Sequence, residues 1–121
     1  MKHYIGTDIV EIARVRQVIE RWGERFLGRV YTVSELKMYD RRPHSLAACF
    51  AGKEAVMKVL GTGARGVAWR EIEVLHLDSG KPYVMLHSRA KEQAEKLDIK
   101  DIDISLSHSR EYATAVAIGT T

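Results

Sequence analysis

The chain has 121 residues, the length of one compact domain, because a core of this size is self-sufficient and a second domain would need more sequence. Hydrophobic residues make up 45% and charged residues 29%, a balance that excludes a disordered tail and predicts a globular protein with a buried core. The 19 Lys and Arg residues exceed the 16 Asp and Glu residues, giving a net charge of +3 that favours an anionic partner. Nucleic acid, an acidic protein and a phosphorylated cofactor all remain open on this basis.

Cysteine content and hydropathy predict a cytoplasmic protein. Cys49 has no second thiol with which to form a disulfide or a Cys-type zinc site, so we expect a reducing compartment and a packing role. No apolar run approaches the roughly 20 residues that span a bilayer. Residues 1–4 lead straight into a strand-like segment and not into a secretory signal. We therefore expect residues 1–121 to be one domain with no membrane segment.

The first predicted elements are a short strand and an amphipathic helix. Residues 4–9 favour β structure, are broken by Gly6 and carry Asp8 near the end of the strand. Residues 11–22 predict a helix that ends at Gly23, and its apolar stripe consists of Ile12, Val15, Val18, Ile19 and Trp22. The arginines that lie mostly off this stripe give a basic outer face, formed by Arg14, Arg21 and Arg25.

Two further helices are predicted in the middle of the chain. Thr32 and Glu35 have the spacing of a capping box, which opens a short helix to about Asp40 before Pro43 interrupts it. A longer helix is predicted over residues 45–60, because apolar residues recur at helical spacing. Its buried stripe consists of Leu46, Cys49, Phe50, Val56, Val59 and Leu60.

The second half of the chain predicts two β-hairpins around one helix. Residues 71–74 and 84–86 form the first hairpin, and residues 103–107 and 112–118 form the second, with turn-forming residues between each pair. Ser88 is expected to cap the helix between the hairpins, which continues to about Leu97. Interspersed helices and strands without internal repeats predict an α+β fold built on a small antiparallel sheet.

Glu54 and Lys58 are candidate ligand-binding residues, because side chains four positions apart share one face of a helix. The alternative is an ordinary surface ion pair of little energetic weight. Directly after this helix, the sequence Gly61-Thr62-Gly63 exposes backbone amides that suit a phosphate, although it also fits a simple helix C-cap.

Asp8 is a second candidate, because with Glu54 it supplies the two carboxylates that Mg²⁺ commonly takes beside a substrate diphosphate. The alternative is that Asp8 caps the following helix. His108 lies between two serines in a predicted turn, where a histidine is either a functional group or a solvated polar residue. The basic helix face is either plain solvated surface or a dock for an acidic protein.

Three segments of the chain form an ordered set of motifs. The first is residues 5–11, with the sequence IGTDIVE, and the last is residues 104–113, with the sequence ISLSHSREYA. The central one is residues 50–55, FAGKEA, followed by Lys58 and Gly61–Gly63. Taken together, these segments resemble the holo-acyl-carrier-protein synthase family of 4'-phosphopantetheinyl transferases. Weaker matches lie in residues 80–83 and 31–39, so the similarity spans nearly the whole chain in the family's order.

The resemblance implies a role for each matching residue. Asp8 and Glu54 would bind Mg²⁺, and Lys58 would contact a phosphate of coenzyme A. The cleft for coenzyme A would be lined by Gly61, Thr62, Gly63, Lys81, Pro82, Ser107 and His108. The partner implied is an acyl carrier protein, whose acidic helix would meet Arg14, Arg21 and Arg25. The resemblance thus implies that the catalytic residues are Asp8, Glu54, Lys58 and His108. It also implies a role in fatty acid biosynthesis.

In the implied reaction, a carrier-protein serine attacks the pantetheine-side phosphorus and adenosine 3',5'-bisphosphate leaves. The serine proton could pass to His108, Glu54 or a metal-bound water, and the sequence does not choose among them. The family also implies a 4'-phosphopantetheinyl transferase fold that assembles as a homotrimer with sites between subunits. Ala113, Ala115 and Ala117 in the last strand would permit such close packing, or would equally pack against a helix of the same chain.

Two positions depart from the family pattern. Many relatives have arginine at the position of Cys49 and alanine at that of Gly52, so a phosphate contact from that arginine would be missing here. Coenzyme A could instead be held through Arg41, Arg42 or His44. Competing hypotheses are a noncatalytic basic binding module and a transferase fold kept only for carrier binding. Two tryptophans and two phenylalanines at core-like positions make no stacking platform for nucleic acid.

Overall fold

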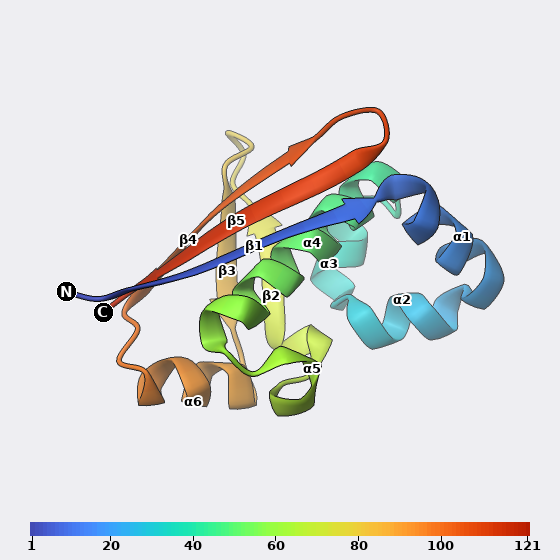
Figure 1. The fold of residues 1–121 in the computed structure, drawn as a ribbon. Coiled ribbons are helices and arrows are strands. Elements are labelled where there is room, and N and C mark those ends of the chain that lie inside the picture. The colour runs from blue at the N-terminus through green and yellow to red at the C-terminus, as the bar shows by residue number, and fades with distance from the viewer.

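A three-stranded antiparallel sheet packs across one long helix (Figure 1). The computed structural model describes the backbone of residues 1–121 and all side chains except those of residues 64 and 65. The sheet has the order β1-β5-β4, from β1 (His3–Glu11), β5 (Tyr112–Thr120) and β4 (Asp101–His108). The helix is α4 (Pro43–Leu60). The predicted α+β class is thereby confirmed.

Small residues let the sheet approach α4 closely. Ala113, Ala115 and Ala117 are buried on the inner face of β5, which lies against α4. The alanine-rich strand therefore packs against a helix of the same chain, which was one of the two alternatives that the sequence left open. A Cβ added to Gly6 of β1 would lie 2.0 Å from the carbonyl oxygen of Ala55, so the strand backbone rests directly on the helix.

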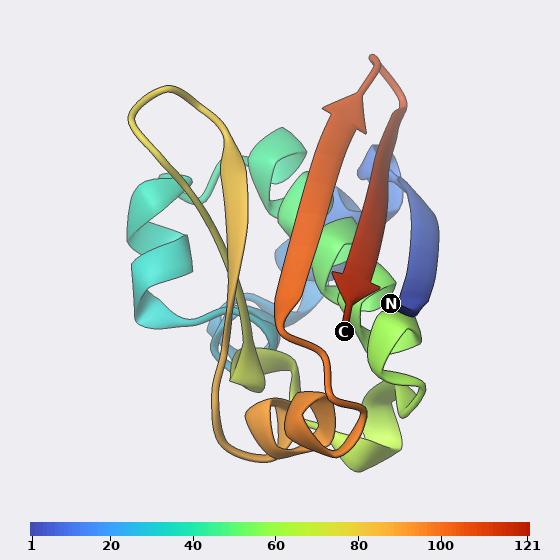
Figure 2. The ribbon, with the colours of Figure 1, turned by 90° about the vertical axis from the view of Figure 1, so that its left-hand side faces the viewer.

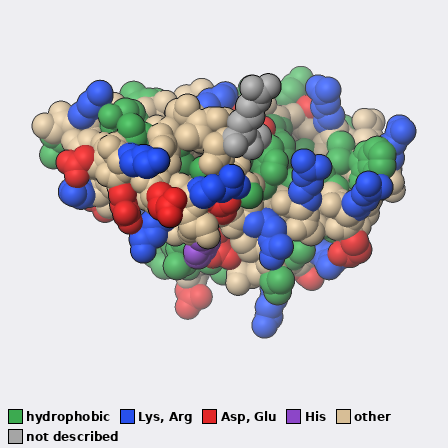
Figure 3. Space-filling model, turned by 90° about the horizontal axis from the view of Figure 1, so that it is seen from below, with side chains coloured by type: hydrophobic (Ala, Val, Ile, Leu, Met, Phe, Trp, Pro, Cys, Tyr) green, Lys and Arg blue, Asp and Glu red, His purple; other side chains and the backbone are tan. Residues whose placement is uncertain are grey.

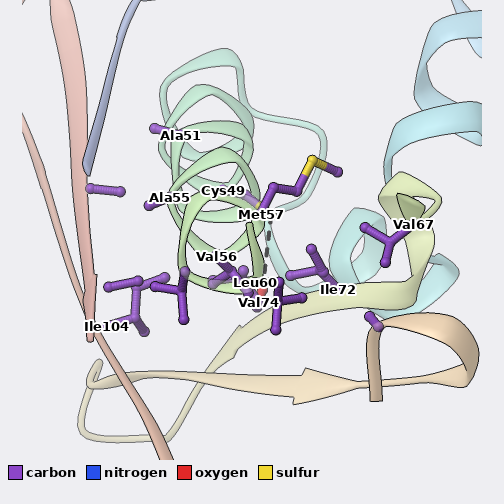
Figure 4. Close-up of a cluster of buried hydrophobic side chains, with 14 of the residues drawn as sticks. Cys49, Ala51, Ala55, Val56, Met57, Leu60, Val67, Ile72, Val74 and Ile104 are labelled. Carbon is purple, nitrogen blue, oxygen red and sulfur yellow. Dashed lines mark hydrogen bonds between the residues drawn. The ribbon is translucent and has the colours of Figure 1, made fainter. Parts of the chain in front are cut away.

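A separate hairpin covers another side of α4 (Figure 2). β2 (Ile72–His76) and β3 (Pro82–Leu86) pair antiparallel, as the first predicted hairpin required, but they form their own two-stranded sheet. In Figure 4, Val56 and Leu60 of α4 meet Val74 and Ile72 of β2 in the buried core. α4 is consequently buried on several sides, and its amphipathic stripe is wider than its sequence pattern predicted.

The remaining helices lie around this core. They are α1 (Ile12–Trp22), α2 (Glu24–Val30), α3 (Val33–Met38), α5 (Gly63–Gly66) and α6 (Ser88–Lys96), with a 3₁₀ turn η1 at Trp69–Glu71. The capping box of Thr32 and Glu35 is present at the start of α3. Neither α2 nor α5 was predicted, because seven and four residues are too short for a clear helical period. Within the described structure, no helix has both the length and the apolar character needed to cross a bilayer.

Several predicted boundaries were wrong for local reasons. Pro43 does not interrupt a helix but begins α4, since the first helical position needs no backbone N–H. Ser88 is the first residue of α6 and caps nothing, because the cap position is His87. β1 continues to Glu11, which places Asp8 inside the strand and excludes its alternative role as a helix cap.

Candidate functional site

Asp8 and Lys58 meet where β1 crosses α4. Gly6 brings the strand onto the helix, and Asp8, two residues later, faces the same side because strand side chains alternate. The Lys58 ammonium donates to the carbonyl oxygen of Thr7 at 2.7 Å and lies 3.3 Å from Oδ1 of Asp8. Residues fifty positions apart in the sequence are therefore held together by direct polar contacts.

Glu54 lies beside this pair, one helical turn before Lys58. Burial raises the pKa of Glu54, the Asp8 carboxylate raises it further, and Lys58 only partly offsets the two effects. Lys58 contacts Asp8, and Glu54 lies one turn before Lys58 on the same face of α4, so the two carboxylates are on the same side of the helix. The arrangement therefore concentrates negative charge at one place, which costs free energy unless a cation is bound there.

The donor set at this place fits Mg²⁺. Oδ2 of Asp8 is buried and has no hydrogen-bond partner among the described side chains and backbone, which leaves its lone pairs for a ligand. Mg²⁺ takes one or two protein carboxylates and completes its octahedron with water and substrate phosphates. No three His, Cys, Asp or Glu side chains of the described residues converge on one point. Asp8 and Glu54 are thus the carboxylates that could hold the ion.

The glycine loop begins one turn after Lys58. Gly61 has φ +72° and its backbone N–H bonds to the carbonyl oxygens of Met57 and Lys58, so it is a helix C-cap. Gly63 also has a positive φ, +59°, and a Cβ added at either glycine would meet nothing within 4 Å. The loop is accordingly open on its outer side, next to Lys58, as a bulky phosphate would require.

Four other predicted site residues lie at or next to the turns of the two hairpins: Lys81, Pro82, Ser107 and His108. Figures 1 and 2 place the turns of both hairpins at one end of the molecule and the loop after α4 at the other. The His108 ring lies 6.1 Å from that of His44, the second residue of α4. In the three-stranded sheet, His108 of β4 is level with Val10 of β1 across β5, so two strands and two residues along the strand separate it from Asp8. Among the described residues no hydrogen bond joins His108 to Asp8.

The predicted basic face is divided between two helices. Arg14 lies on α1 and lines an apolar groove of about 300 Å³ together with Ile9, Val15 and Phe26. Arg21 and Arg25 lie over the exposed Trp22 ring, at 5.2 and 5.8 Å from its centroid. Arg25 belongs to α2, so the helix that the sequence analysis missed is part of this surface.

Position 49 lies in the core and not in the site. Cys49 is fully buried, and its thiol lies 3.3 Å from Oε2 of Glu35, so the cysteine side chain faces the core. The loss of a phosphate contact at this position stays a prediction. Glu35 itself pairs with Lys53, and both side chains are completely buried. From the sequence, Glu35 was expected only to cap α3, and Lys53 was not among the predicted site residues, although a lysine inside an apolar helical stretch is itself an unusual feature.

The two arginines offered as substitutes already have partners within the chain. Arg41 pairs with Glu24, and Arg42 donates to the carbonyl oxygen of Tyr39 at 3.2 Å. Gly52 has a packing role, because a Cβ at this position would lie 3.1 Å from Cδ1 of Ile104 on β4.

Comparison with known proteins identifies the family. The model of the 4'-phosphopantetheinyl transferase superfamily matches residues 4–117. The chain belongs to this superfamily. Within the superfamily it is 49% identical to the holo-acyl-carrier-protein synthase of Dehalococcoides mccartyi over 115 residues, covering 95% of this chain and 96% of the relative.

Solved structures of the superfamily have the same fold. The holo-acyl-carrier-protein synthase of Neisseria meningitidis has a TM-score of 0.89 at 32% identity, covering 98% of each chain. That of Helicobacter pylori, solved in complex with coenzyme A, has a TM-score of 0.87 at 31% identity, covering 96% of this chain and 99% of that one. The chain is a phosphopantetheinyl transferase of the holo-acyl-carrier-protein synthase type.

Proposed function

We propose that this chain transfers 4'-phosphopantetheine from coenzyme A to a serine of an apo-acyl carrier protein, with Mg²⁺ held by Asp8 and Glu54. The products are the holo-carrier and adenosine 3',5'-bisphosphate. The observation that carries the proposal is the convergence of Asp8, Glu54 and Lys58 where β1 crosses α4, with Oδ2 of Asp8 free for a ligand. The coenzyme A complex of the Helicobacter pylori relative supports the choice of co-substrate.

The residues of the chain have distinct roles in this proposal. A bound Mg²⁺ supplies positive charge for the diphosphate of coenzyme A and for the leaving group. Lys58, oriented by the carbonyl oxygen of Thr7, adds a second positive charge beside it. The open loop after α4 would receive phosphate at Thr62 and Gly63, because the backbone amide of Gly61 already bonds to carbonyl oxygens of α4. The carrier serine must lose a proton, and the chain offers two acceptors, Glu54 with its raised pKa and His108.

We further propose that the complete site forms between copies of the chain in a homotrimer. On the outer face of the three-stranded sheet, β1 and β5 present exposed apolar side chains, with Ile5 65% and Ile9 62% accessible beside Val116 and Ile118, whereas the outward side chains of β4 are polar. A contiguous apolar surface of this kind is typical of a subunit interface. Lys81, Pro82, Ser107 and His108 lie at or next to the hairpin turns, without a hydrogen bond to Asp8 among the described residues, and a neighbouring copy could supply them to the coenzyme A cleft.

The surface that carries Arg14, Arg21 and Arg25 is the proposed dock for the carrier protein. Arginines around an exposed tryptophan suit an acidic helix with an apolar contact at its centre. Nucleic acid is a poorer partner, because acidic side chains stand among the basic ones over the face seen in Figure 3. A cytoplasmic location and a role in fatty acid biosynthesis complete the proposal, and the free, buried thiol of Cys49 agrees with a reducing compartment.

Mass spectrometry of a carrier protein tests the function. With Mg²⁺ and coenzyme A, an apo-carrier should gain the mass of phosphopantetheine, and Asp8→Asn or Glu54→Gln should abolish the gain. An unchanged mass across a panel of apo-carriers that still bind the chain would favour a transferase fold kept for carrier binding. Salt-sensitive binding to random DNA that ignores coenzyme A would favour the noncatalytic basic module.

A further inference from the structure

A fully buried ion pair lies directly behind the proposed metal site. The Lys53 ammonium is 2.7 Å from Oε1 of Glu35, and both side chains have 0% exposure. Lys53 also donates to the carbonyl oxygens of Ile72 at 2.6 Å and Trp69 at 3.1 Å. Three oxygens therefore use all three hydrogens of the ammonium group. Lys53 is the residue before Glu54, so the ion pair holds α4 in place at the residue next to the proposed metal ligand.

Both carboxylate oxygens of Glu35 accept further hydrogen bonds. Its Oε1 accepts from the backbone N–H of Thr32 at 2.8 Å, and its Oε2 accepts from that of Val74 at 2.7 Å. The thiol of Cys49 donates to the same Oε2 at 3.3 Å. Cys49 and Lys53 are one turn apart, so two successive turns of α4 bind one carboxylate. The network thereby connects α4 with α3, η1 and β2.

These contacts determine the rotation of α4 about its own axis. Successive helical residues point about 100° apart, so Lys53 faces α3 and β2 while Glu54 faces β1. Apolar packing of Val56 or Leu60 tolerates small rotations, but hydrogen bonds to fixed backbone groups do not. A buried ion pair rarely stabilises a fold more than apolar residues of the same volume would. Structural specificity is therefore the better account of its presence.

We propose that Lys53 and Glu35 are positioning residues for the metal-binding carboxylate. The pair fixes the rotation of α4, so that Glu54 faces Asp8 at the spacing that one divalent cation requires. The inference rests on the proposed function, because it assigns a metal to Asp8 and Glu54. A displacement of about 1 Å in a catalytic group can cost on the order of 100-fold in rate, so a small rotation would suffice to impair the enzyme.

The test compares two ways of removing a contact from the same core. The double variant Glu35→Met with Lys53→Met removes both charges, keeps the volume and should fold. The control Tyr39→Phe removes the hydroxyl that donates to the carbonyl oxygen of Val74 at 2.6 Å, a contact between the end of α3 and β2 that does not include α4. Mn²⁺ affinity, measured by electron paramagnetic resonance without substrate, is the primary reading, with kcat and KM for coenzyme A alongside.

The double variant should bind Mn²⁺ at least 10-fold more weakly than the parent and lose kcat by about 10- to 100-fold. Tyr39→Phe should change both by less than twofold at temperatures where it is folded. Should the double variant not fold, Glu35→Gln takes its place, with a smaller loss of Mn²⁺ affinity expected.

Mn²⁺ binding within twofold of the parent in the folded double variant, or in Glu35→Gln where that replaces it, overturns the inference alone. A parent that binds no Mn²⁺, or whose binding survives Asp8→Asn, overturns the proposed metal site and the inference together.

Discussion

The ammonium of Lys58 lies 3.3 Å from Oδ1 of Asp8, and it is anchored there by the carbonyl oxygen of Thr7. A cation next to two carboxylates assists a departing phosphate but competes with a metal ion. We therefore expect Lys58→Gln to lower kcat by roughly 10²–10³ while leaving Mn²⁺ affinity equal or higher. Single-turnover rates and Mn²⁺ titration check this expectation. Weaker metal binding with an unchanged rate would contradict it.

Repulsion between the carboxylates of Asp8 and Glu54 predicts that the stability of the chain depends on pH. Because burial and Asp8 raise the pKa of Glu54, the folded chain binds more protons than the unfolded chain, and this contribution to stability is lost as pH rises through the raised value. Without divalent ions at pH 8, Glu54→Gln should therefore unfold at a higher temperature than the parent, and the difference should shrink below the ordinary pKa of 4.5.

Thermal unfolding followed by circular dichroism at both pH values provides the measurement. Mg²⁺ should raise the melting temperature of the parent and have little effect on Glu54→Gln, because the variant lacks one of the two ligands. A difference in melting temperature that does not vary with pH would rule out this explanation.

Two glycines predict opposite effects of the same substitution. Gly6→Ala places a Cβ 2.0 Å from a backbone oxygen of α4, which should cost about 1–3 kcal/mol and weaken metal binding by separating β1 from the helix. Gly28→Ala, in α2 with nothing within 4 Å of the new Cβ, should stabilise the chain by roughly 0.4–1 kcal/mol. Urea unfolding of both variants distinguishes the two cases.

The proposed site between subunits predicts complementation between inactive chains. Asp8→Asn and His108→Ala should each be inactive alone, whereas a 1:1 mixture after subunit exchange should recover about a quarter of the parent activity, since one interface in four would have both native residues. Activity of the mixture that stays at the level of the separate variants would place both residues in one copy.

Charge reversal on the proposed carrier dock should weaken binding of the carrier protein and leave binding of coenzyme A unchanged. Arg14→Glu should raise KM for the carrier protein by about 10-fold or more and reduce its salt dependence, with KM for coenzyme A unchanged. Lys91→Glu makes the same charge change on the exposed side of α6, on the other side of the molecule in Figure 1. Equal effects of the two variants would argue for net charge in place of a specific dock.

Local signals in the sequence determined most of the elements. The capping box of Thr32 and Glu35, the helical spacing in residues 11–22 and the turn residues of both hairpins act over a few positions, so they are readable without the fold. The order of three short motifs indicated the family, because each motif keeps its residues together along the chain. α2 was missed since its few residues show no clear period.

Tertiary structure alone decided which residues became neighbours. Asp8 and Lys58 are fifty positions apart, and only the close crossing of β1 and α4 at Gly6 brings them into contact. The same holds for Glu35, whose capping role was visible locally but whose buried partner Lys53 was not. His108 shows the reverse, because a matching motif gave no indication that it would lie beside His44 and two strands away from Asp8. Contacts between distant residues depend on how whole elements pack, and packing free energy has no local signature in the sequence.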